Sequence, residues 1–134
     1  MLWLVGLPIL TLHRAMVWQT DLSLWTDATV WSASPRAWID LGAAQYRRLS
    51  EATATSTHID QIDGWAEQAR VTFIEGRRLA RDRGWSDAVA VADLDLALME
   101  HGAGRDAAAR WYLTDARGPR RSEVERLCQL IGCD

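Results

Sequence analysis

Residues 59–80, with the sequence IDQIDGWAEQARVTFIEGRRLA, decide the class of fold. Apolar or small side chains recur in this stretch at alternating steps of three and four residues, which places them on one face of an α-helix. These positions are Ile59, Ile62, Ala66, Ala69, Phe73, Gly76 and Ala80. A helix cannot cover its own apolar face, so other parts of the fold must pack against this helix along its whole length. The stretch therefore predicts a fold in which a long helix is packed against others.

Two helices are expected upstream of this stretch. Residues 20–31 repeat the helical spacing with Leu22, Trp25, Ala28 and Trp31 on one face. Ser34 then caps and Pro35 occupies the first position of the next helix, where its missing N–H costs nothing. That helix should run to about residue 49. Residues 50–57, SEATATST, are small, polar and rich in Thr, and they predict a loop.

A helix and a turn are expected directly downstream. Gly84 should end the long helix, and Ser86 should cap a helix that runs to Glu100 and is apolar on almost every face. Such a helix is usually central in its domain. Gly102 and Gly104 then supply the turn that reverses the chain.

Two further helices complete the expected fold. One covers residues 105–117, and Ser122 with Glu125 forms a capping box for a last helix, 122–131, that would cap the domain. Short connections between helices of this length predict antiparallel hairpins stacked side by side. We therefore expect an all-α fold of about six helices, including an apolar amino-terminal one, with no competing strand pattern.

The composition excludes some classes of function. The chain has 134 residues, 49% of them apolar and 25% charged, with a net charge of -3. This balance predicts a folded chain, and it offers no clustered positive field for binding DNA or RNA. Eight Trp residues are more informative, because each indole brings a large apolar area that belongs in a core or an interface.

The two cysteines leave two interpretations open. Cys128 and Cys133 are too few for a disulfide framework and lack the spacing of a zinc site. They are either incidental thiols or, if Gly132 ends a helix and lets the chain double back, a pair that meets and oxidises in an exporting compartment.

No pattern of residues predicts catalysis or a bound cofactor or metal. His13, His58 and His101 lie far apart in the sequence, and Asp93 and Asp95 project from different faces of a helix. A phosphate-binding loop, a nucleophile elbow and an HExxH motif are all missing from the sequence. We expect a protein that binds others and is not an enzyme.

The segment Val91–Pro119 resembles a tetratricopeptide repeat, a unit of about 34 residues made of two helices. Five positions fit the family's pattern together: Leu94, the turn glycine Gly102, the small Ala107 where the helices cross, the aromatic Trp111 and the terminal Pro119. Three positions depart from it: Asp95 replaces the usual Gly, Leu98 the usual aromatic residue and Thr114 the usual Ala.

A second copy of the repeat begins at AWIDLG, residues 37–42. Its matching positions are Trp38, Leu41 and Gly42 in the first helix and Ala69 and Phe73 in the second. This copy needs about 15 extra residues between its helices, which the Ser/Thr-rich segment would absorb.

Residues 1–32 form an apolar amino-terminal segment that we separate from the helical domain, 33–134. Residues 1–12 are apolar apart from Thr11, but a bilayer needs about 20 such residues, and no basic region precedes them as in a secretory signal. A core helix, an interfacial or truncated membrane helix and an export signal all remain open, with possible membrane contact through residues 1–18. The side chains for docking to a membrane or partner would be Trp3, Leu7, Leu12, Trp18 and Trp25.

One further likeness concerns the junction 22–42, LSLWTDATVWSASPRAWIDLG. It is similar to the point at which a final membrane helix enters a tetratricopeptide tail in certain polytopic membrane glycosyltransferase-type proteins. This likeness favours membrane attachment. For the chain as a whole, a membrane-associated or periplasmic location is slightly favoured over a cytoplasmic one.

The resemblance implies a site and a function. In the family the first helix of each pair lines the concave face, which would place eight side chains along a groove for a peptide or protein partner: Arg36, Ile39, Ala43, Tyr46, Val89, Ala92, Leu96 and Met99. These residues are equally well explained as plain core. The expected function is a scaffold or adaptor, and the alternative is a structural subunit of a larger membrane-associated complex, docked through the Trp-rich amino-terminal segment.

Overall fold

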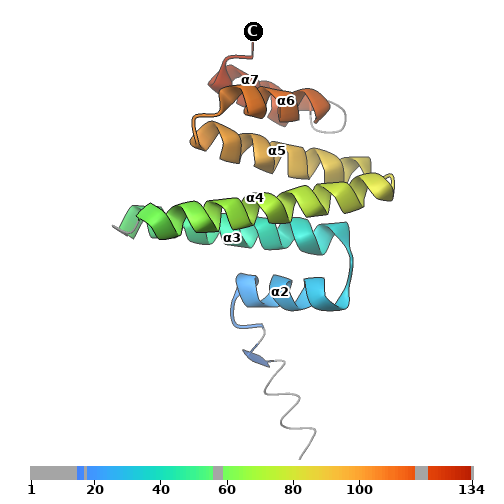
Figure 1. Ribbon diagram of the computed structural model, residues 1–134. Helices are drawn as coiled ribbons and strands as arrows, with labels where there is room; N and C mark the ends of the chain where they lie inside the picture. Colours follow the sequence, from blue (N-terminus) through green and yellow to red (C-terminus); the bar gives the residue numbers. More distant parts are fainter. Residues whose placement is uncertain (1–14, 17, 56–58, 117–120, 134) are drawn as a thin grey trace, which may run out of the picture.

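The computed structural model describes residues 15–16, 18–55, 59–116 and 121–133, which hold six α-helices and no β-strand. This confirms the all-α class. In Figure 1 the helices lie in layers, and successive helices cross the molecule in alternating directions. Their bounds are α2, Asp21–Trp31; α3, Pro35–Thr55; α4, Ile59–Asp82; α5, Ser86–Gly102; α6, Asp106–Asp115; and α7, Arg121–Ile131.

Helix α5 lies at the centre of the packing. It contacts α4 and α6, its neighbours in the chain, and also α3 and α7. Its side chains enter two core clusters, as expected for a helix that is apolar on almost every face. The cluster shared with α3 and α4 contains Ile39, Ala69, Phe73, Ala92, Leu96 and Met99. The cluster shared with α6 and α7 contains Leu94, Ala97, Ala109, Leu113, Ala116, Val124 and Ile131.

Two glycines allow α3 and α4 to approach closely. A Cβ added to Gly42 would lie 2.9 Å from the ring of Phe73, and one added to Gly76 would lie 2.8 Å from Cγ1 of Ile39. Both distances are shorter than packed carbon atoms tolerate. These glycines therefore set the spacing of the two longest helices.

The Ser/Thr-rich segment is helical as far as Thr55, which corrects the predicted loop there, and residues 56 and 57 lie outside the described residues. Helix α3 continues through Thr55. Its hydroxyl groups donate back to carbonyls one turn earlier: Ser50 to Tyr46 at 3.1 Å and Thr53 to Leu49 at 2.6 Å. These bonds satisfy the polar side chains within the helix, so low intrinsic propensity is not enough to end it.

Three glycines end helices in the left-handed backbone region, with φ of 69° at Gly84 and 73° at both Gly104 and Gly132. In each turn the residue after the glycine donates its N–H to the carbonyl five residues before it, as in a Schellman motif. The pairs are Trp85 to Ala80, Arg105 to Glu100 and Cys133 to Cys128. The prediction that Ser86 caps α5 is wrong by one residue, because Trp85 is the N-cap and its side chain makes no capping bond.

Candidate partner-binding surface

The eight predicted groove residues differ in how far the structure buries their side chains. Four side chains belong to the core and are at most 7% exposed: Ile39, Ala92, Leu96 and Met99. Ala43, Tyr46 and Val89 are partly buried, and Arg36 is exposed. The four core residues contact neighbouring helices. Two of them also line hollows, Ile39 at the start of α3 and Met99 near the α5–α6 turn.

The open side of α5 lies one residue away from the predicted positions. It carries Ala88, Val91, Asp95 and Leu98, all at least partly exposed and spaced by three or four residues. A shift of one residue turns a helical position by about 100°, from the core to solvent. The sequence of α5 hides this difference because both sides are rich in apolar residues.

Two hollows flank this side of α5. The larger, of about 620 Å³, lies between the start of α3, the α4–α5 turn and α5, with Arg36, Trp85 and Val91 among its lining residues. The smaller, of about 330 Å³, lies between α5 and α7 and includes Val91, Leu98 and Leu127. Val91 lines both hollows. We call the surface that holds them the α3–α5–α7 face.

Charged groups surround the apolar residues of this face. The acidic lining residues are Asp40, Asp87, Asp95 and Glu123, and the basic ones are Arg36 and Arg126. Arg36 and Asp40 form an ion pair of 3.4 Å one turn apart on α3. The face is thus apolar at its centre and more acidic than basic around it.

The opposite side of α5 carries a buried ion pair that the sequence did not predict. Asp93 is completely buried and accepts a hydrogen bond from Nε of Arg77 on α4. Arg77 also donates from Nη2 to Asp115 at 2.6 Å, and its guanidinium lies 5.2 Å from the ring centre of Trp111. Burial raises the pKa of Asp93, although Arg77 acts in the opposite direction.

A second buried carboxylate lies one heptad further along α5. Glu100 is 3% exposed and accepts a hydrogen bond from Nε of Arg105. Asp93 and Glu100 are seven residues apart and so share a helix face. The sequence contains one signal for these pairs, namely acidic residues in a helix that is otherwise apolar. A buried charge needs a partner, so such residues indicate an ion pair.

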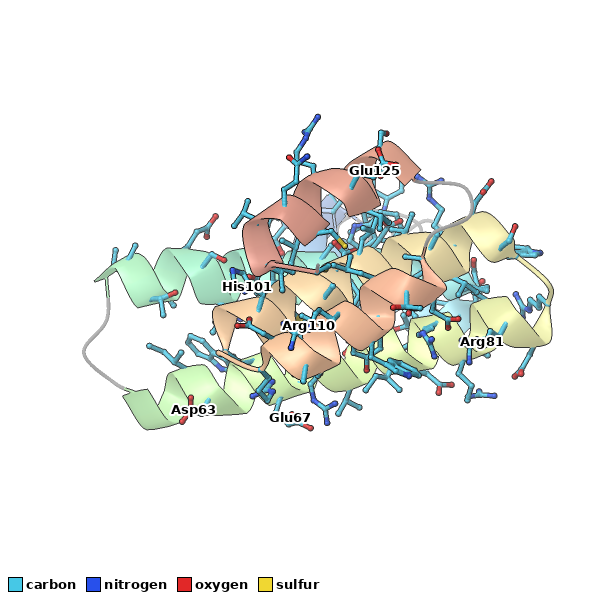
Figure 2. The ribbon with its side chains drawn as sticks, turned by 90° about the horizontal axis from the view of Figure 1, so that it is seen from above. Asp63, Glu67, Arg81, His101, Arg110 and Glu125 are labelled. Atoms are coloured by element: carbon cyan, nitrogen blue, oxygen red, sulfur yellow. The ribbon has the colours of Figure 1, made fainter. Side chains whose placement is uncertain are left out.

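A third hollow, of about 540 Å³, lies at the end of the molecule where α3 and α4 meet the α5–α6 turn. Figure 2 labels Asp63, Glu67 and His101 at this end. Two arginines line the hollow. Arg70 is paired with Glu67 by two hydrogen bonds of 2.8 and 3.0 Å, and Arg105 is paired with Glu100. The α3–α5–α7 face is the better candidate surface, because its two hollows share an apolar centre around Val91 and Leu98.

The second helix of the Val91–Pro119 segment places two of its family positions in solvent. Trp111 is 57% exposed and Ala107 is also exposed. Two residues later, Ala109 and Leu113 are almost completely buried. The buried positions of this helix therefore lie two residues after those that the resemblance implies.

The predicted docking residues lie in the amino-terminal part. Trp3, Leu7 and Leu12 lie outside the described residues. Trp18 is 69% exposed and Trp25 is partly buried. Among the residues with a described position, no helix has both the length and the apolar content needed to cross a bilayer.

The described residues contain no group of three or more His, Cys, Asp or Glu side chains placed to hold a metal ion. His101 is the last residue but one of α5, and its Nδ1 lies 2.8 Å from Oδ1 of Asp106.

No family model matches the chain, and no curated protein or solved structure matches it.

Proposed function

We propose that this chain is a scaffold of tetratricopeptide-like helical pairs that binds a segment of another protein on its α3–α5–α7 face. The observation that carries the proposal is the pair of hollows on either side of α5, which share Val91 and leave Leu98 38% exposed. Concave, partly apolar surfaces with a charged rim are the usual places for a peptide to bind.

Equivalent spacing in the two helical pairs supports the repeat arrangement. In α4, Ala69, Phe73 and Gly76 are buried at steps of four and three residues. In α6 and its C-cap residue, Ala109, Leu113 and Ala116 are buried at the same steps. The first helices also correspond, because Leu41 and Gly42 in α3 match the buried Leu96 and Ala97 in α5.

The charge of the face suggests the chemistry of the partner. Its acidic side chains outnumber its basic ones, and its centre is apolar around Val91 and Leu98. We therefore expect an amphipathic segment, helical or extended, that presents apolar side chains flanked by Lys or Arg.

The test compares two variants with nearly equal starting exposure. Leu98 on the proposed face is 38% exposed, and Ile74 on α4 is 36% exposed. Leu98→Arg should abolish co-purification of the natural partner from cells that express the chain, whereas Ile74→Arg should retain it. Circular dichroism and thermal unfolding would show that both variants fold. The proposal would be refuted if both variants retained the partner equally, or if only Ile74→Arg lost it.

A second candidate function is a structural subunit of a membrane-associated assembly. Helix α2 favours it, because it contacts only α3 among the described helices and none of its residues is fully buried. Val30 is 75% exposed and Trp31 is 77% exposed at the end of α2, and Trp18, which precedes the helix, is 69% exposed. Flotation of the full chain with liposomes tests this function. Binding that is lost in a Trp18→Ser and Trp31→Ser double variant would support it, and failure of the wild type to float would refute it.

A further inference from the structure

We propose that Cys128 and Cys133 form a reversible disulfide that fastens the end of α7 when the protein meets a disulfide oxidant. The two thiols belong to the turn that ends α7, where Gly132 has φ of 73°. They are the only cysteines in the chain, so any intramolecular disulfide joins these two.

The backbone brings the two residues together. The N–H of Cys133 donates to the carbonyl of Cys128 at 3.1 Å, and the N–H of Gly132 donates to the same oxygen at 2.9 Å. A hydrogen bond across five residues folds the chain back on itself, and the first and last side chains of such a turn commonly touch. We infer that the two Cα atoms lie within the range of about 4.4–6.8 Å that a disulfide spans.

An equivalent turn in the same protein shows this side-chain contact directly. At Gly104 the corresponding backbone bond joins Arg105 to Glu100, and there the Arg105 side chain donates to the Glu100 carboxylate. Cys128 and Cys133 occupy the positions of Glu100 and Arg105 in their own turn. The shared motif therefore directs both cysteine side chains to the same side of their turn, as it does those of Glu100 and Arg105.

Both thiols are partly buried and pack against the second core cluster, which Val124 and Ile131 of α7 help to form. They thus remain open to a small oxidant while being held on the same side of the helix end. A disulfide here would fix the last turn of α7 to the chain that follows it.

The chemistry is thiol–disulfide exchange with a small or protein disulfide such as oxidised glutathione. The thiolate of one cysteine attacks a sulfur of the oxidant, forms a mixed disulfide and releases one thiolate. The second cysteine then attacks the mixed disulfide and releases the other thiolate. Two protons leave the cysteines, the two sulfurs are oxidised by two electrons, and one disulfide of the oxidant is reduced to two thiols.

In the experiment the full chain is equilibrated with oxidised and reduced glutathione. An alkylating reagent then quenches the thiol–disulfide exchange, and mass spectrometry measures the mass of the protein. The expected product has lost two hydrogen atoms and carries no alkyl group. Its melting temperature should exceed that of the reduced chain by roughly 5 °C. Cys128→Ser and Cys133→Ser should instead accumulate the mixed disulfide with glutathione.

A glycine substitution tests the geometry itself. Gly132→Ala keeps both thiols but disfavours the left-handed backbone, so the equilibrium constant for the disulfide should fall roughly tenfold. Gly84→Ala introduces the same backbone strain in a distant turn, with φ of 69°, and should leave that constant unchanged. The proposal would be overturned if the wild type gave only the mixed disulfide or disulfide-linked dimers. It would also be overturned if Gly132→Ala and Gly84→Ala had the same equilibrium constant for the disulfide.

Discussion

Arg77 on α4 donates a hydrogen bond to Asp93 on α5, and the Asp93 carboxylate is completely buried while the Arg77 side chain is 11% exposed. The pair joins the long helix to the central one beneath Trp111. It also explains how a charged residue can occupy the inner side of α5, since an unpaired carboxylate would be strongly disfavoured there.

Removing the cation of this pair should destabilise the fold strongly. Arg77→Met keeps much of the side-chain volume but leaves Asp93 buried without its hydrogen-bonded cation, which costs about 3 kcal/mol of unfolding free energy. The neighbouring Arg78→Met is the matched control, because Arg78 forms only exposed pairs with Glu75 and Asp82. Urea unfolding of both variants measures the difference. Equal stability of the two would contradict the assigned role of Arg77.

The raised pKa of Asp93 predicts the direction in which stability changes with pH. The folded state holds the Asp93 proton more tightly than the unfolded state, so it binds more protons in the window above the ordinary Asp pKa of about 3.9. Stability should therefore fall as pH rises through that window. Asp93→Asn lacks this contribution, so the unfolding free energy of the wild type minus that of the variant should decrease with rising pH and then level off. A difference that increases with pH would show that the sign is wrong.

Two glycines on the same helix should respond oppositely to alanine. Gly76→Ala places a Cβ 2.8 Å from Ile39 Cγ1 and 3.1 Å from its backbone nitrogen, which should destabilise the fold by roughly 1–3 kcal/mol. Gly64→Ala meets no atom within 4 Å and should stabilise it by roughly 0.5–1 kcal/mol. Thermal unfolding distinguishes the two variants. The same direction of change in both would mean that α3 and α4 do not approach as closely as described.

The hydroxyl of Thr20 caps α2, where it accepts the N–H of Ser23 at 3.1 Å. Thr20→Ala should weaken this helix by about 1 kcal/mol. Because α2 buries no residue fully, the change should appear as faster hydrogen exchange in α2, with little effect on α4. Thr26→Ala, inside the helix, is the control and should not accelerate exchange. Uniform acceleration across the protein would show that α2 is part of the cooperative core.

The sequence predicted a helix and its buried face well where apolar residues lay on only one face of that helix. The seam of α4 marked Ala69, Phe73 and Ala80 as core, and all three are buried. Polar residues misled the prediction at Ser50–Thr55, because hydroxyl groups that bond to their own helix do not end it. Helix ends were therefore predicted less well than helix interiors.

The candidate site was harder to predict for a different reason. Helix α5 has apolar residues on nearly every side, so periodicity could not distinguish Leu96, which is buried, from Leu98, which is exposed. Only the positions of α3, α4, α6 and α7 around it decide which side is free. The pairing of Asp93 with Arg77 likewise depends on how α4 and α5 cross, which no local pattern encodes.

Photo-crosslinking tests the central claim most directly. A photoreactive amino acid replaces Leu98 in one variant and Ile74 in another, each in the full chain and in cells that express it naturally. Residue 98 should yield one dominant adduct with another protein, and the attached peptide should be amphipathic with basic flanks. Residue 74 should yield none. Adducts of equal yield at both positions, or an adduct at residue 74 alone, would contradict binding on the α3–α5–α7 face.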